Sequence, residues 1–202
     1  MSSLPSSSHA LLASLRAAFS GRLVSDPAGM APWLRDYRQR WGGPALAVVQ
    51  PDSTADVAAV VRWCVDHDAV VVPQGGNTGL TGASVPLGVP LSRLPSGAPP
   101  ASANKAPSDA PDPSQARTTG GADVQPRPVI LLSLSRMQQV RSVDALASTM
   151  VVEAGCTLQA AQEAAAAHGR LFPLSLASEG SCTIGGNLAT NAGGVQVLRY
   201  GN

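Results

Sequence analysis

A glycine-rich stretch at residues 73–86 is the first part of the sequence suited to binding chemistry. It follows directly on an apolar run, so it begins where a strand is expected to end. Glycines permit positive φ and let backbone N–H groups approach an anion closely, and short polar side chains add further donors. The composition therefore suits a pyrophosphate group. The residues concerned are Gly75, Gly76, Gly79 and Gly82, with Asn77, Thr78 and Ser84.

This stretch does not match the common nucleotide-binding motifs. No Gly-Lys-Ser/Thr follows it, so the Walker pattern is absent, and its glycines lack the Gly-x-Gly-x-x-Gly spacing of a Rossmann turn. P-loop NTPases and NAD enzymes are therefore disfavoured. A tight structural loop would explain one such stretch equally well.

A second glycine-rich stretch, residues 178–194, repeats this chemistry far along the chain. It combines glycine pairs with the polar side chains of Asn187, Thr190 and Asn191. Two such loops in one domain suggest a long ligand that is held at both ends.

The elements before the first stretch predict how it is positioned. Residues 45–49 form an apolar run typical of a buried strand, and residues 69–72 form a β-branched strand that ends at Pro73. Between them, the Ser53-x-x-Asp56 capping pattern begins a helix over residues 53–65. Such a strand–helix–strand unit favours a parallel pair, with ligand chemistry at the carboxyl end of the strand.

The rest of the chain predicts further helices and strands around a long insertion. Nine of the seventeen prolines lie within residues 89–128, where large apolar side chains are nearly absent, so this segment is predicted to be a disordered insertion. The remaining predicted elements are a helix at 10–19, strands at 129–134, 137–143 and 149–153, and a helix from Leu158 to His168, capped by Thr157 and stopped by Gly169.

Charge and composition exclude several classes of partner. The 14 basic residues nearly balance the 13 acidic ones, so no nucleic-acid or anionic-membrane partner is expected. No apolar run approaches the roughly 20 residues that span a bilayer. Cys64, Cys156 and Cys182 show neither a zinc pattern nor a disulfide framework, which favours a reducing cytoplasm and no metal.

The two stretches together resemble the FAD domain of the vanillyl-alcohol oxidase / p-cresol methylhydroxylase flavoprotein family. Within that family the similarity is greatest to the D-lactate, glycolate and D-2-hydroxyglutarate dehydrogenase branch. The motifs that carry it are Pro73-Gln-Gly-Gly-Asn-Thr-Gly-Leu80, Ser84-Val-Pro86 and Gly180-Ser-Cys-Thr-Ile-Gly-Gly-Asn-Leu-Ala-Thr-Asn-Ala-Gly-Gly194, with Val48-Val-Gln-Pro51, Leu134-Ser-Arg-Met137, Val152-Glu-Ala-Gly155 and Arg199-Tyr-Gly201.

The resemblance implies an α+β, two-subdomain PCMH-type fold with FAD between the subdomains. The pyrophosphate would lie on the first stretch, and the second would line the flavin end. Residues 1–40 would form a helical lead-in, and residues 41–202 an incomplete FAD domain that is truncated at its C-terminus. The implied cofactor-binding residues are Pro73, Gly75, Gly76, Asn77, Thr78, Gly79, Leu80, Ser84, Val85, Ser181, Cys182, Thr183, Gly185, Gly186, Asn187, Ala189, Thr190 and Asn191.

One departure from the family pattern bears on how FAD is held. Relatives with covalently bound flavin often carry a histidine after the paired glycines, and here that position is Asn77. The resemblance therefore implies non-covalent FAD.

The activity implied by the resemblance is oxidation of a small 2-hydroxy acid by hydride transfer to FAD. The family's substrate-binding domain, catalytic histidines and metal ligands would lie beyond Asn202, so no catalytic or metal-binding residue is assigned to this chain. Two alternatives stay open. One is another flavoenzyme of the same fold, such as a sugar oxidase or a cell-wall precursor reductase, and the other is a truncated product that is inactive by itself.

Overall fold

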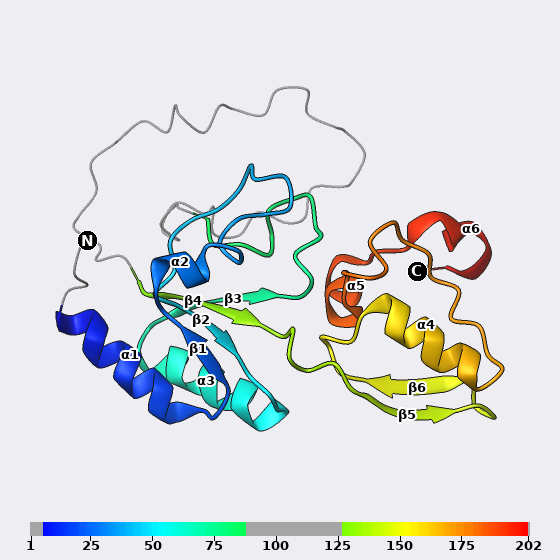
Figure 1. Cartoon of the computed structure of the whole chain (residues 1–202), viewed down its shortest axis with the longest axis horizontal. Helices are drawn as coiled ribbons and strands as arrows, with labels where there is room; N and C mark the ends of the chain where they lie inside the picture. Colours follow the sequence, from blue (N-terminus) through cyan, green and yellow to red (C-terminus); the bar gives the residue numbers. More distant parts are fainter. Residues whose placement is uncertain (1–5, 88–126, 202) are drawn as a thin grey trace. The chain divides into compact units, whose positions relative to one another are not determined.

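The computed structural model describes residues 6–87 and 127–201, so nearly all of the insertion predicted over 89–128 lies outside the described residues (Figure 1). The helices and strands within them are α1 (Ser6–Ala18), β1 (Arg22–Val24), α2 (Pro27–Met30), β2 (Ala47–Gln50), α3 (Thr54–Asp66), β3 (Val70–Gln74), β4 (Val129–Ser133), β5 (Val140–Asp144), β6 (Thr149–Val152), α4 (Leu158–Ala167), α5 (Ile184–Thr190), η3 (Gly194–Gln196) and α6 (Val197–Tyr200).

Four strands form a sheet in the order β1-β2-β4-β3. Strands β2 and β3 are both parallel to β4, while β1 is antiparallel to β2. The predicted parallel direction of β2 and β3 is thus confirmed, but β4 lies between them. Because Ile130 and Leu131 of β4 are fully buried on opposite faces, this strand takes a central position, as expected for an apolar run in a parallel sheet.

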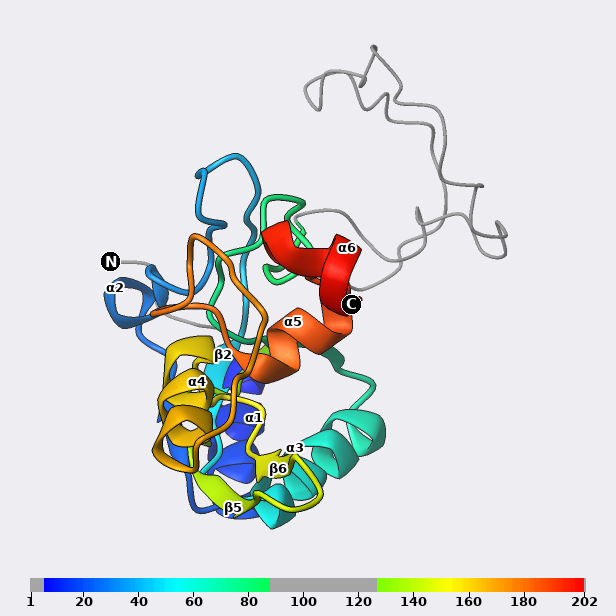
Figure 2. The ribbon, with the colours of Figure 1, turned by 90° about the vertical axis from the view of Figure 1, so that its right-hand side faces the viewer.

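Two helices cover one face of this sheet. Helices α1 and α3 lie side by side, and the Trp63 indole N–H donates to Ser14 Oγ at 2.9 Å (Figure 1, Figure 2). Leu15 and Trp63 pack with Val49 of the sheet in the same core. On the opposite face, Val48 packs with Met30. Strand β1 and helix α1 thus share the core of the sheet, although both lie inside the predicted lead-in.

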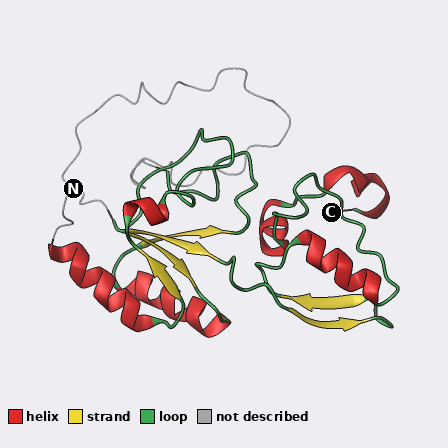
Figure 3. Ribbon diagram, in the orientation of Figure 1, coloured by secondary structure: helices red, strands yellow, loops and turns green. Residues whose placement is uncertain are grey.

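The second sheet is the hairpin of β5 and β6, next to α4 (Figure 3). Thr157 caps α4 by accepting from Ala160 N at 3.2 Å, and Gly169 follows the helix with φ +66°. The predicted signals for the beginning and the end of this helix are both confirmed. After α4 the chain continues to the second glycine-rich stretch, residues 178–194. This stretch therefore belongs to the same part of the fold as the hairpin and α4.

Candidate cofactor site

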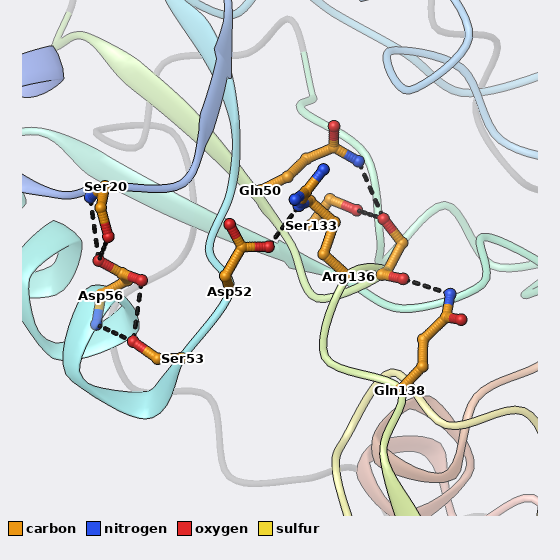
Figure 4. A network of polar contacts seen from close by, with 9 residues as sticks. Ser20, Gln50, Asp52, Ser53, Asp56, Ser133, Arg136 and Gln138 are labelled. Carbon is orange, nitrogen blue, oxygen red and sulfur yellow. Dashed lines mark hydrogen bonds and ion pairs between the residues drawn. The ribbon is translucent and has the colours of Figure 1, made fainter.

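Polar side chains end all three parallel strands, at the carboxyl edge of the sheet. Gln50 donates to Ser135 Oγ at 2.9 Å, and Ser133 donates to the same hydroxyl at 3.0 Å (Figure 4). The side chain of Gln50 is buried, and its Oε1 has no hydrogen-bond partner among the described residues. Buried acceptors in proteins are nearly always satisfied, so this oxygen is an exception among the polar atoms of this edge.

Gln74, the polar residue that ends β3, holds the first glycine-rich stretch in place. Its side chain is only 2% exposed, and its Nε2 donates to Trp33 O and to Ser84 O, each at 2.9 Å. The backbone of Gln74 also accepts from Leu134 N at 3.0 Å. The stretch is therefore tied at both ends to the sheet and to the segment that follows α2.

Asn77 shapes the turn within this stretch. Its φ is +53°, a conformation that asparagine adopts more readily than most residues. Its Nδ2 donates to Arg35 O at 2.8 Å, and its Oδ1 accepts from Ser84 Oγ at 2.8 Å. Both amide atoms are therefore engaged in holding the loop.

Gly75 and Gly76 lie against the second glycine-rich stretch. A Cβ at Gly75 would overlap Thr183 Oγ1, and a Cβ at Gly76 would overlap the carbonyl oxygen of Ser181. The two stretches, far apart in sequence, are thus in direct contact, and at Gly76, where backbone meets backbone, glycine is required. Contact between the two stretches is what a ligand held by both would need.

Gly79 differs from its neighbours because no contact with a described residue requires a glycine there. A Cβ at this position would have no heavy atom of the described residues within 4 Å, and its φ does not lie in the positive range. Close approach of a ligand to the backbone is a physical reason for glycine at such a position. The stretch thus fits a pyrophosphate. Gly82, by contrast, has φ +75° and faces the Trp41 ring, so its glycine is structural.

The second stretch is partly a helix, which corrects the prediction that it forms a loop. Helix α5 begins after Thr183, whose side chain accepts from Gly186 N at 3.4 Å, and ends at Asn191 with φ +51°. Gly185 lets the helix pack closely on Ala154, since a Cβ there would lie 2.7 Å from the Ala154 Cβ. The glycine pair lowers helix propensity, but this packing overrides it. Thr183 and Asn191 were the capping signals available in the sequence.

The other predicted site residues differ in how accessible they are. Cys182 and Thr183 are buried, and Leu158 N donates to Cys182 O at 3.1 Å, which ties the stretch to α4. Val85 is also buried. Asn187 and Thr78 are half-buried, and the exposed residues are Pro73, Leu80, Ser181, Ala189, Thr190 and Asn191.

A cleft beside the first stretch was not predicted from the sequence. It has a volume of about 890 Å³ and is lined by the segment 27–44 together with Gly76 and Asn77. Buried Asp36 orders this segment, because its carboxylate accepts from Trp41 N at 2.7 Å and from Arg38 N at 3.3 Å. The sequence signal for this ordered segment was Asp36, because a short acidic side chain can accept hydrogen bonds from the backbone N–H groups of its own turn.

Asp36 is expected to make stability depend on pH in the acidic range. The Trp41 N–H bond and further backbone N–H bonds lower the pKa of Asp36 below its ordinary value of 3.8. A lowered folded-state pKa stabilises the protein above the pKa of the unfolded chain, and this contribution is lost as pH falls through the folded-state pKa. In urea denaturation, Asp36→Asn should therefore be less stable than the wild type above about pH 5, with the difference shrinking at lower pH. A difference independent of pH would contradict this assignment.

In 6–87 and 127–201 no group of three or more His, Cys, Asp or Glu side chains is placed to hold a metal ion. No helix in the same residues has the length and hydrophobicity needed to cross a membrane.

Burial raises the pKa of the Cys64 thiol to about 11, so this free cysteine stays protonated at neutral pH.

Two curated relatives are similar to this chain over nearly its whole length. It is 35% identical over 181 residues to the D-2-hydroxyglutarate dehydrogenase of Xanthomonas citri pv. viticola, covering 90% of this chain and 30% of the relative. It is 33% identical over 195 residues to the mitochondrial D-2-hydroxyglutarate dehydrogenase of Bos taurus, covering 95% of this chain and 28% of the relative. The chain therefore spans less than a third of the length of these relatives.

Solved structures with the same fold are PCMH-type flavoenzymes. Alkyldihydroxyacetonephosphate synthase matches with a TM-score of 0.70 and 19% identity, covering 96% of this chain and 31% of that chain. p-Cresol methylhydroxylase matches with a TM-score of 0.57 and 16% identity, covering 92% and 30%. The α+β PCMH-type fold implied by the sequence is confirmed.

The match to a family model covers more than half of the chain. The FAD binding domain model matches residues 45–94 and 114–202, which include both glycine-rich stretches. The cofactor of this domain is FAD. With its fold, its two contacting stretches and this match, the chain belongs to the FAD-binding domain family.

Proposed function

We propose that this chain holds FAD non-covalently against its two contacting glycine-rich stretches. The observation that carries the proposal is the contact of Gly75 and Gly76 with Ser181 and Thr183, next to a Gly79 that no contact with a described residue requires. Backbone N–H groups around Gly76 and Gly79 would hold the pyrophosphate, with Thr78 beside them. The stretch from Ser181 to Asn191 would line the flavin end.

The chemistry of the first stretch supports non-covalent binding. Residues 73–86 contain no histidine, cysteine or tyrosine that could bond to the flavin ring. Asn77 offers only an amide, and both of its polar atoms are engaged with Arg35 O and Ser84 Oγ. No covalent link is therefore expected at this loop.

Acid precipitation tests this mode of binding. The purified chain should show flavin absorbance, and acid should leave a colourless pellet with all of the FAD in the supernatant. Acid-denatured chain to which free FAD is added serves as the control for adsorption. A pellet that keeps flavin absorbance after washing would show a covalent link and contradict the proposal. A chain that binds no FAD at all would contradict the cofactor site itself.

We further propose that the protein containing this domain oxidises a 2-hydroxy acid, with D-2-hydroxyglutarate first among the candidates and D-lactate and glycolate after it. The names of the relatives support D-2-hydroxyglutarate and D-lactate, and glycolate is included because of the sequence resemblance. Bound FAD would accept a hydride from the carbon that bears the hydroxyl. The residues of this chain would bind and orient the cofactor, and a substrate-binding domain outside these 202 residues would position the acid.

A chimera tests the substrate class. This chain would replace the matching part of the Xanthomonas citri enzyme, and FAD in the chimera should lose its visible absorbance when D-2-hydroxyglutarate is added without oxygen. The 202-residue chain loaded with FAD is the matched control and should keep its absorbance. A chimera that binds FAD but is not reduced by any of the three acids would contradict the proposed reaction.

The cytoplasm is the proposed location. The three cysteines are free and buried, which suits a reducing compartment. Relatives with mitochondrial in their names suggest the mitochondrion as the alternative, and cell fractionation would decide between the two.

A further inference from the structure

The loop formed by residues 35–41, here called the basic loop, concentrates positive charge. It contains three arginines and one aspartate, whereas the whole chain has a net charge of only +1. Arg35, Arg38 and Arg40 are all exposed, and none forms an ion pair with a residue that the structure describes. The buried carboxylate of Asp36 accepts from backbone N–H groups and cancels one of the three charges, so the loop keeps a net charge of +2.

The basic loop is held in a defined conformation. Arg35 pairs with Gly42 in an antiparallel bridge, and Asp36 N donates to Trp41 O at 3.0 Å. The Arg35 carbonyl also accepts from Asn77, and Trp41 lies against Gly82. A surface that is ordered before binding loses less conformational entropy when a partner docks.

A cleft with polar and apolar walls adjoins these charges. The cleft of about 890 Å³ has Pro32, Leu34 and Pro44 in its walls, next to Arg35 and Tyr37. The Tyr37 side chain is 73% exposed and Trp41 is 42% exposed. Arginine, tyrosine and tryptophan are the residues enriched at binding hot spots, and a pocket beside them accommodates an anchoring side chain.

We propose that the basic loop and this cleft form a docking surface for an acidic segment of another protein. The carboxylates of the partner would pair with Arg35, Arg38 and Arg40, and one apolar side chain would enter the cleft. Charge complementarity favours this occupant over a neutral one. The apolar wall residues Pro32, Leu34 and Pro44 favour it over a nucleic acid, whose backbone would use the arginines and make no apolar contact with these residues. The basic loop lies outside the FAD site proposed above, whereas the cleft shares Gly76 and Asn77 with that site.

A binding experiment with a defined probe tests the proposal. The probe is a short fluorescent peptide of glutamates around one central leucine, and its anisotropy is followed as the 202-residue chain is added. The double variant Arg38→Glu, Arg40→Glu should weaken binding at least about tenfold, and added salt should weaken the wild-type complex. Ala31→Trp, which places a large ring at the cleft wall, should also weaken binding. Arg62→Glu, at an exposed arginine of α3, is the matched control and should leave the affinity unchanged.

Three results would overturn the proposal. One is unchanged affinity in the double variant, and another is an equal loss in Arg62→Glu. The third is equally tight binding of a single-stranded DNA of the same charge, which would mean that the loop selects negative charge alone. The milder Arg38→Gln, Arg40→Gln variant replaces the double variant if the latter does not fold, with circular dichroism as the check on folding.

Discussion

Replacing Gly76 with alanine is expected to lower the affinity for FAD at least about tenfold and the free energy of unfolding by about 1–3 kcal/mol. The new Cβ would overlap the carbonyl oxygen of Ser181, and a backbone atom cannot move aside as the end of a flexible side chain can. The two glycine-rich stretches would have to separate, so the cofactor would lose contacts at both. Urea denaturation and quenching of FAD fluorescence measure the two effects.

Gly79→Ala is the matched control, because its Cβ would meet no atom of residues 6–87 or 127–201. The free energy of unfolding should stay the same or rise by about 0.4–1 kcal/mol, since alanine restricts the unfolded chain. The affinity for FAD should nevertheless fall, because the methyl group would occupy the space proposed for the cofactor. Wild-type affinity in Gly79→Ala would contradict the placement of the pyrophosphate at this position.

Gln74→Leu is expected to reduce the free energy of unfolding by about 2–4 kcal/mol, because the carbonyl groups of Trp33 and Ser84 would both lose their donor. The same change should weaken FAD binding, since these bonds hold the first stretch against the sheet. Urea denaturation with and without saturating FAD measures both effects.

Gln138→Leu is the control for this change. The Gln138 side chain is exposed and bonds to Ser135 O at the surface, so its replacement should change stability by no more than about 0.5 kcal/mol. Equal losses in the two variants would mean that Gln74 contributes nothing beyond an ordinary exposed hydrogen bond.

Local signals allowed much of the fold to be predicted from the sequence. Ser53 and Thr157 each begin a helix, because a hydroxyl that accepts from a backbone N–H acts within one turn. The direction of β2 and β3 also followed from a local unit. The position of β4 between them did not, because it depends on burial on both faces of a sheet, which no short segment reveals.

The cofactor site was predictable to the same extent. Few kinds of loop require a composition as rich in glycine as that of the first stretch. Gly75, Gly76 and Gly79 could therefore be named from the sequence. The hydrogen bonds that hold this loop could not, because Gln74 reaches Trp33 and Asn77 reaches Arg35 only in the folded chain. Helix α5 was missed since its packing on Ala154 is a tertiary contact.

The central position of β4 has a consequence for the order in which the chain can fold. During synthesis β2 and β3 emerge first, yet each pairs with β4, which begins only at Val129. Until then the facing edges of both strands have no partner, and such edges are open to pairing with other chains. Lengthening the interval between Gln74 and Val129 would hardly change stability, since each doubling of a loop adds only about 0.6 kcal/mol of closure entropy. It would, however, prolong the time for which the nascent sheet is incomplete and prone to aggregate.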